Sequence, residues 1–127
     1  MRKVFFESFG KIAQENKDIF FLIGDLGTKF ADNFKDADKS RLFINAGIAE
    51  ANMAGVAAGL ALSGKNPYCY SIIPFLIMRA FEQIRVDICY PNLNVKFLGA
   101  GGGLVYGKEG FTHHAVEDIA IMRSLPN

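Results

Sequence analysis

The sequence predicts an α/β domain in three layers, a mostly parallel sheet with helices on both faces. Three observations support this prediction. Short apolar runs of strand length alternate with longer segments that carry helical spacing. Parallel strands need crossover connections, which helices of ten or more residues supply. The chain has 127 residues, the length of a single domain with a substantial core.

The first helix is expected over residues 3–16, because apolar side chains recur there on one helical face. These side chains are Val4, Phe5, Phe9 and Ile12. Residues 18–24 form a short apolar strand that ends at a glycine, and the polar residues 25–41 form a solvated loop. A second strand is expected over residues 42–45.

A second helix is expected from about Ile48 to Ser63. Asn45 is suited to cap its start, and Gly64 suits the left-handed conformation after its end. Residues 67–72 then form a third strand with a proline at its entry.

A third helix is expected from Pro74 to about Cys89. Its apolar stripe consists of Ile77, Phe81, Ile84 and Ile88. Residues 94–100 form a fourth strand, which leads into a glycine-rich loop and a short helix near residues 115–123.

Composition and charge exclude several classes of protein. With 14 basic and 13 acidic residues, the net charge of +1 offers no electrostatic footprint for nucleic acid or an anionic membrane. No apolar run reaches the ~20 residues of a membrane span, and the first residues do not form a signal peptide. Cys69 and Cys89 form no CxxC pair, which indicates buried, inert thiols and a cytoplasmic setting.

In parallel sheets, ligands bind beyond the carboxyl ends of the strands. Residues 24–27, 45–50, 71–75 and 100–114 are expected to meet there. Glu50 belongs to this set and is the single charge within residues 47–60. A helix that is apolar nearly all round is normally buried, where an ionised carboxylate needs a partner. Glu50 is therefore a candidate site residue, although a helix N-terminus also favours an acidic residue.

The glycine-rich loop does not match a nucleotide-binding motif. GAGGG follows a strand, but no helix opens directly after it, and no GxxxxGK[ST] occurs in the chain. His113 and His114 lie near Glu117 and Asp118, but adjacent histidines point apart and the chain has no other histidine, so no metal site is predicted. A structural alternative stays open, in which Thr112 caps the next helix and the acidic residues are solvated.

Several separated motifs occur in one order along residues 41–127. They are GIAEANM, an aromatic helix start after a strand, G-x-THH-x-x-ED and the closing RSLPN. Residues 18–127 thereby resemble the pyrimidine-binding domain of transketolase-type enzymes, which depend on thiamine diphosphate. More distant members of this architecture are 1-deoxyxylulose-5-phosphate synthase and the beta subunit of pyruvate dehydrogenase. The resemblance implies the thiamine-diphosphate-binding fold, with residues 1–127 as one pyrimidine-type domain that is incomplete at its C-terminal end.

The resemblance also implies roles in cofactor binding. A glutamate at the position of Glu50 hydrogen-bonds N1′ of the aminopyrimidine and promotes formation of the thiazolium C2 ylide, which attacks a ketose carbonyl. Phe75 corresponds to a residue that stacks on the pyrimidine, with Met78 and Phe81 completing an apolar pocket. Packing in the core alone would give the same spacing for these three residues. Asp25 corresponds to an aspartate near the thiazolium, or is simply a turn residue.

On the substrate side, the resemblance makes His113 a residue that contacts substrate oxygens and moves protons. Glu109 takes the place of a shorter acidic residue that binds a substrate hydroxyl. Phe111 replaces a customary proline, and Gly101 stands where transketolases place another histidine. Because of these departures, we expect the substrate-side loop to differ in shape from the corresponding loop of transketolases.

Such active sites form between two domains, and the second holds magnesium and the diphosphate through a GDG motif with a downstream asparagine. These 127 residues contain no such pair, since GDLG at residues 24–27 does not match it. We therefore expect a diphosphate-binding partner domain or subunit, and a homo- or hetero-oligomer. The chain is expected to be a fragment or one component of a split enzyme, inactive by itself.

Three functions follow from the resemblance. The first is ketol (two-carbon) transfer between sugars, with Glu50 as the activating residue. The second is a non-catalytic interaction or regulatory module of the same fold. The third is a subunit of a synthase or dehydrogenase that uses pyruvate, and donor substrates distinguish it from the first.

Overall fold

A computed structural model describes residues 2–28 and 43–127 of the chain. Most of the loop predicted over residues 25–41, and the first residue of the strand predicted over 42–45, lie outside these ranges. The elements in order are α1 (Arg2–Glu15), β1 (Ile19–Ile23), β2 (Phe43–Asn45), α3 (Glu50–Leu62), β3 (Asn66–Ile72), the π-helical η2 (Pro74–Met78), α4 (Phe81–Gln83), the π-helical η3 (Ile84–Cys89), β4 (Lys96–Ala100), the 3₁₀-helical η4 (Gly107–Glu109) and α5 (Asp118–Met122).

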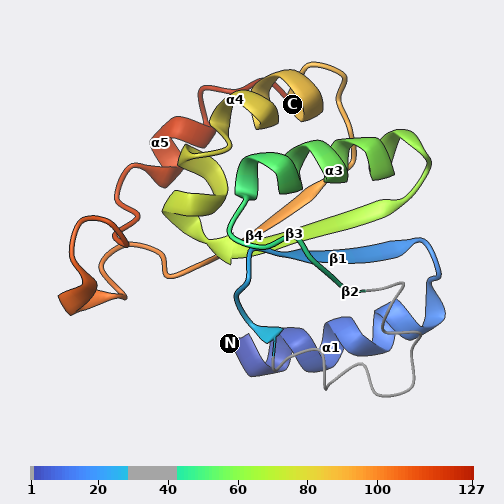
Figure 1. The fold of residues 1–127 in the computed structure, drawn as a ribbon, viewed down its shortest axis with the longest axis horizontal. Coiled ribbons are helices and arrows are strands. Elements are labelled where there is room, and N and C mark those ends of the chain that lie inside the picture. The colour runs from blue at the N-terminus through green and yellow to red at the C-terminus, as the bar shows by residue number, and fades with distance from the viewer. Residues whose placement is uncertain (1, 29–42) are drawn as a thin grey trace.

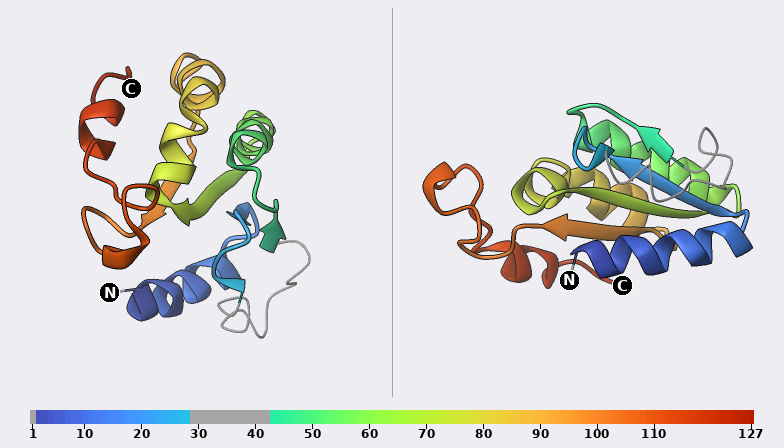
Figure 2. Two further views of the ribbon diagram at one scale, coloured as in Figure 1. Left: turned by 60° about the vertical axis from the view of Figure 1, so that its left-hand side comes forward. Right: turned by 90° about the horizontal axis from the view of Figure 1, so that it is seen from below.

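The four described strands form one sheet in the order β2-β1-β3-β4, and every pair is parallel. Helix α1 covers one face, while α3 and the helical segment of residues 74–89 cover the other (Figure 1). Figure 2 shows the same layers from two further sides. The predicted α/β fold with a parallel sheet between helical layers is therefore confirmed.

The face of α1 that packs on the sheet is the predicted one only in part, because Phe5 and Phe9 belong to the apolar cluster there and Val4 and Ile12 do not. Val4 and Ile12 are 63% and 55% exposed, whereas Phe6, Phe9 and Ala13 are buried. The edge of the Phe6 ring meets Tyr70 with the ring centroids 5.4 Å apart, and the helix turns toward these aromatic contacts. The larger rings remove more apolar surface from water than Val4 and Ile12 would, which decides the orientation.

The other face of the sheet holds the second apolar cluster. Small residues of α3 let it lie close to the sheet and to the helical segment opposite; they are Ala54, Ala57 and Ala58. In the predicted stripe of residues 77–88, Ile77, Ile84 and Ile88 are buried and Phe81 is half-buried. The predicted single helix is instead divided into η2, α4 and η3, with a turn at residues 79–80.

The two cysteines differ in their surroundings. Cys69 is fully buried in this cluster, and burial raises the pKa of its thiol to about 12, so it is inert as expected. Cys89 is only half-buried, although desolvation also raises the pKa of its thiol. Within the described residues, no helix has both the length and the apolar character to cross a membrane.

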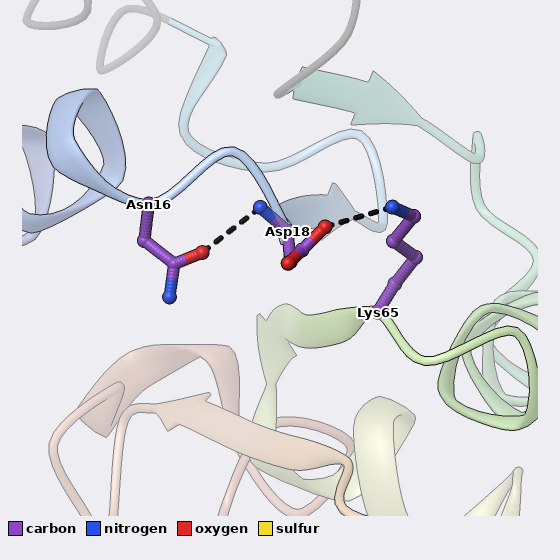
Figure 3. A network of polar contacts seen from close by, with 3 residues as sticks. All are labelled: Asn16, Asp18 and Lys65. Atoms are coloured by element: carbon purple, nitrogen blue, oxygen red, sulfur yellow. Dashed lines mark hydrogen bonds and ion pairs between the residues drawn. The ribbon is translucent and has the colours of Figure 1, made fainter.

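A polar network closes the edge of the sheet where the strands begin. The backbone N–H of Asp18 donates to Asn16 Oδ1 at 2.9 Å, and Lys65 Nζ lies 2.7 Å from Asp18 Oδ1 (Figure 3). This network joins the turn before β1 to the turn before β3, where Gly64 adopts the predicted left-handed conformation with φ +77°. Since the pair is exposed, its contribution to stability is small.

Candidate functional site

The carboxyl ends of the strands bring the four predicted segments together. Beyond β1, the N–H of Gly24 donates to Tyr70 O at 3.0 Å, and the N–H of Ala46 donates to Ile23 O at 2.9 Å. The Phe75 ring, just after β3, contacts the ring of His113 from the loop that follows β4. These contacts confirm that one edge of the sheet gathers residues far apart in the sequence, as Figure 1 shows at its left.

Glu50 lies at this edge as the first residue of α3, and its side chain is only 1% exposed. Ser71 Oγ donates to its Oε1 at 2.9 Å, and Arg79 Nη1 donates to its Oε2 at 2.6 Å. A buried carboxylate is tolerated when it is paired and hydrogen-bonded, and both conditions hold here. The start of α3 adds a favourable dipole. Glu50 is thus a buried anion held by groups from two other segments.

Gly24 leaves the space that the Glu50 carboxylate occupies. A Cβ at residue 24 would lie 2.9 Å from Ser71 Oγ and 3.0 Å from Glu50 Oε1. Such contacts are closer than side chains adopt, so one of the two groups would have to move.

We therefore expect Gly24→Ala to lower the free energy of unfolding by about 1–3 kcal/mol through overpacking. Gly59→Ala, in the exposed middle of α3, is the matched control because nothing lies within 4 Å of its added Cβ. Chemical denaturation of both variants measures the difference, and an unchanged midpoint for Gly24→Ala would show that this corner of the sheet is loosely packed.

Phe75 is half-buried in η2 and is the centre of an aromatic and cationic group. The His113 ring meets it edge-on at 5.1 Å between centroids, with 74° between the planes. Arg79 Cζ lies 4.8 Å from the centroid of the Phe75 ring, within range of a cation–π interaction. Because Arg79 also binds Glu50, contacts run without a break from Glu50 through Arg79 and Phe75 to His113.

Thr112 holds the His113 ring from the side of Nδ1. Its Oγ1 donates to Glu109 O at 3.2 Å and lies 2.9 Å from His113 Nδ1. Thr112 consequently stabilises the loop around His113, and the alternative in which it caps the last helix is wrong.

His114 has a structural role. Its Nε2 lies 3.0 Å from Gly107 O, and since a carbonyl only accepts, Nε2 carries the proton. The adjacent histidines therefore have separate partners, as expected. In the part of the chain that the structure describes, no three His, Cys, Asp or Glu side chains are placed to hold a metal ion.

Asp25 lies at the same edge but in a separate pair. Its N–H donates to Asn45 Oδ1 at 3.2 Å, and Asn45 Nδ2 donates to Asp25 Oδ1 at 2.8 Å. Asp25 adopts φ +53°, a conformation that aspartate tolerates better than most residues. The prediction that Asn45 caps α3 is wrong, because its side chain joins β2 to this turn and the residue before α3 is Ala49, without a side-chain cap.

The other predicted site residues, Met78, Phe81 and Glu109, have no ring contact with Phe75 and no hydrogen bond to Glu50 among the described contacts. Met78 is half-buried and packs against the apolar cluster beneath α3, and Phe81 is half-buried at the start of α4. The ring contacts of Phe75 are with His113 and Arg79 rather than with Phe81. Glu109 ends η4 with an exposed side chain.

Two residues of this group, Ser71 and Arg79, were not predicted from the sequence. A signal for Arg79 does exist, because it is the one charge within residues 67–81, just as Glu50 is the one charge within residues 47–60. A lone acid and a lone base in two apolar helical segments are natural partners. Ser71 carries no comparable signal, since it is one polar residue in a buried strand.

Tyr106 explains the glycine at residue 101. Gly101 has φ +81°, and a Cβ placed there would overlap the Tyr106 ring. The Tyr106 ring also lies 5.6 Å from the His113 ring, measured between centroids. Any side chain at residue 101 would require Tyr106 to move. A histidine at residue 101 is therefore incompatible with this position of the Tyr106 ring.

A cavity of about 530 Å³ lies apart from this group, between α1 and β4, on the opposite face of the sheet from Glu50. Its walls include Phe5, Phe97 and Val105, and none of the predicted site residues lines it.

The parallel sheet between helical layers, with a buried, paired glutamate and an aromatic ring at its carboxyl edge, defines an α/β protein of the class whose ligands generally bind at that edge. A family model described as "Transketolase, pyrimidine binding domain" matches residues 1–127. The chain belongs to this family, which confirms the resemblance seen in its motifs.

Individual relatives agree with this membership. A subunit of the apulose-4-phosphate transketolase of Phocaeicola vulgatus is 38% identical over 126 residues, covering 98% of this chain and 40% of the relative. The putative transketolase C-terminal section of Methanocaldococcus jannaschii is 39% identical over 132 residues, covering 100% of this chain and 40% of the relative. Among solved structures, a split-gene transketolase described as an inactive beta4 tetramer is 41% identical with a TM-score of 0.82, covering 99% of this chain and 40% of that chain. The chain thus spans 40% of the length of each of these proteins.

Proposed function

We propose that this chain is the pyrimidine-binding component of a transketolase-like enzyme that transfers two-carbon ketol units between sugars with thiamine diphosphate. The observation that carries the proposal is Glu50, a carboxylate kept out of water at the carboxyl edge of the sheet and linked through Arg79 to the Phe75 ring. An aminopyrimidine presents a ring nitrogen for hydrogen bonding and two flat faces for stacking. A buried carboxylate next to an aromatic ring is the donor set that fits it.

Bound thiamine diphosphate would supply a stabilised carbanion equivalent at its thiazolium ring, which amino acid side chains lack. Glu50 would hold a proton at the ring nitrogen of the aminopyrimidine, a task for which exclusion from water suits it. Phe75 would orient the ring by stacking, with Met78 and Phe81 filling the apolar side. Asp25 would lie near the thiazolium.

The substrate side follows from the loop of residues 100–114. His113, whose ring contacts Phe75, would accept a proton from a substrate hydroxyl and return it. Glu109, exposed at the end of η4, would bind another hydroxyl of the sugar. Phe111, which is 80% exposed, would lie at the rim of this side of the site.

The diphosphate and magnesium would be bound by a further domain or a partner subunit. Two observations support this part of the proposal. The chain spans 40% of the length of its relatives, and the relative from Phocaeicola vulgatus is named as a subunit. Exposed apolar side chains on the loop beside the site, such as Leu104 and Val105, would be covered in that assembly. A cytoplasmic setting accords with sugar transfer and with the free thiols.

The test is reconstitution of the enzyme from its parts. The tagged chain is co-expressed and purified with its diphosphate-binding partner, and consumption of a ketose phosphate donor is measured with and without thiamine diphosphate and magnesium. We expect turnover that requires the cofactor and both components. Pyruvate is the alternative donor. Consumption of pyruvate alone would reassign the chain to a synthase or dehydrogenase, and a complex without activity on either donor would make it a non-catalytic module.

A further inference from the structure

Arg79 contacts both side chains, Glu50 and Phe75, that the proposed function assigns to binding of the aminopyrimidine. Its Nη1 donates to Glu50 Oε2 at 2.6 Å, and its Cζ lies 4.8 Å from the centroid of the Phe75 ring. One guanidinium therefore uses the carboxylate meant for a ring nitrogen and the aromatic ring meant for stacking. The cofactor ring and Arg79 compete for the same two partners.

The chemistry of the two groups is alike. A guanidinium is planar and delocalised, donates N–H groups to a carboxylate and stacks on aromatic rings. An aminopyrimidine with a proton at its ring nitrogen has the same properties along its amidine edge. The site that suits one consequently suits the other.

Burial identifies which partner can leave. The Arg79 side chain is 45% exposed, whereas the Glu50 side chain is 1% exposed and is also held by Ser71 at 2.9 Å. Arg79 can carry its charge into water at small cost, while Glu50 cannot follow it. The carboxylate stays in place and the guanidinium is the movable group.

The backbone around Arg79 is suited to such a movement. Arg79 follows the π-helical η2, and its N–H donates to Pro74 O over a long 3.4 Å. Ala80, with φ −100° and ψ 14°, interrupts the helix before α4 begins at Phe81. Breaks of this kind in a helix often occur at functional sites, because they leave a side chain less constrained than in a regular helix.

From these observations we infer that Arg79 is a placeholder. It neutralises Glu50 and covers Phe75 until an aminopyrimidine displaces it, and this inference rests on the roles proposed for Glu50 and Phe75. Displacement consumes part of the binding energy, so Arg79 weakens the binding of the pyrimidine ring and favours ligands able to take over both contacts. A purely structural ion pair predicts the opposite, since loss of Arg79 would then only damage the site.

The test uses the full chain and 4-amino-5-hydroxymethyl-2-methylpyrimidine, the neutral aminopyrimidine half of thiamine. A neutral probe is chosen because removal of a cation does not alter its long-range attraction to the site. Binding is measured by calorimetry for the wild type, Arg79→Met, Arg79→Gln and Glu50→Gln. Arg79→Gln retains a hydrogen-bond donor for Glu50, and thermal unfolding checks that each variant is folded. The matched control is Arg85→Met, an exposed arginine of the same helical segment.

We expect Arg79→Met to bind the probe about tenfold more tightly than the wild type, the size of one charge-assisted hydrogen bond. Arg79→Gln should gain affinity to a smaller degree, Arg85→Met should match the wild type, and Glu50→Gln should lose binding. If the wild type binds in a Glu50-dependent way and neither Arg79 variant binds more tightly, the placeholder role is wrong and the proposed function stands. If no folded variant binds the probe, the placeholder role is overturned, and reconstitution with the partner decides the proposed function separately.

Discussion

A Glu50→Gln variant of the reconstituted enzyme is expected to lose about 10²–10⁴-fold in cofactor-dependent turnover, the range for removal of a group that moves a proton. Glutamine preserves the shape of the side chain; its one carbonyl oxygen can accept from Arg79, and its amide N–H can donate to Ser71 Oγ. It cannot share a proton with the ring nitrogen of the cofactor. The loss should therefore fall on kcat more than on stability.

Steady-state kinetics with saturating thiamine diphosphate measures this effect, and thermal unfolding reports whether the fold is intact. Glu7→Gln is the matched control, because Glu7 is exposed on α1 and its ion pair with Lys3 spans 3.8 Å at the surface. An active Glu50→Gln variant with a kcat near that of the wild type would remove Glu50 from the mechanism.

Phe6→Ala should have the largest effect on stability, about 3–5 kcal/mol. Phe6 is fully buried, and its ring meets Phe21 and Tyr70 edge-on with centroids 5.6 and 5.4 Å apart. Loss of the ring removes two of the aromatic contacts that hold α1 on the sheet. Phe6 also lines the cavity between α1 and β4, so its loss enlarges a space that is already present.

Urea denaturation measures the change in the free energy of unfolding. Phe111→Ala is the control of the same residue type, since Phe111 is 80% exposed and its loss should change stability by no more than about 0.5 kcal/mol. Similar destabilisation by the two substitutions would show that α1 is not anchored through Phe6.

Elements with one dominant signal were predicted correctly from the sequence. The strands of residues 19–23, 66–72 and 96–100 lie within about two residues of their expected bounds, because short apolar runs flanked by turn residues have few other stable conformations. Gly64 was placed correctly for a similar local reason. The face of α1 was predicted only in part, since it depends on which rings of the sheet lie beneath it.

Glu50 shows where sequence reasoning about the site ends. One acid in an apolar helix must find a partner, and the order of the elements brings it to the carboxyl edge. The sequence alone does not decide between Arg79 and another donor, because the pair is separated by 29 residues and forms only when α3 and η2 pack on the same face. The cofactor and substrate roles of all the predicted site residues stay predictions; they are Glu50, Phe75, Met78, Phe81, Asp25, His113 and Glu109.

The sequence by itself determined the alternation of strands and helices, the family through its ordered motifs, and the need of Glu50 for a partner. All of these depend on local patterns that the chain carries in any conformation. Only the tertiary structure decided that Ser71 and Arg79 hold Glu50, that Arg79 covers Phe75, and that the His113 ring contacts Phe75. Those contacts require side chains from separate segments to reach within hydrogen-bonding or ring-contact distance, and packing of the sheet and helices is what brings them there.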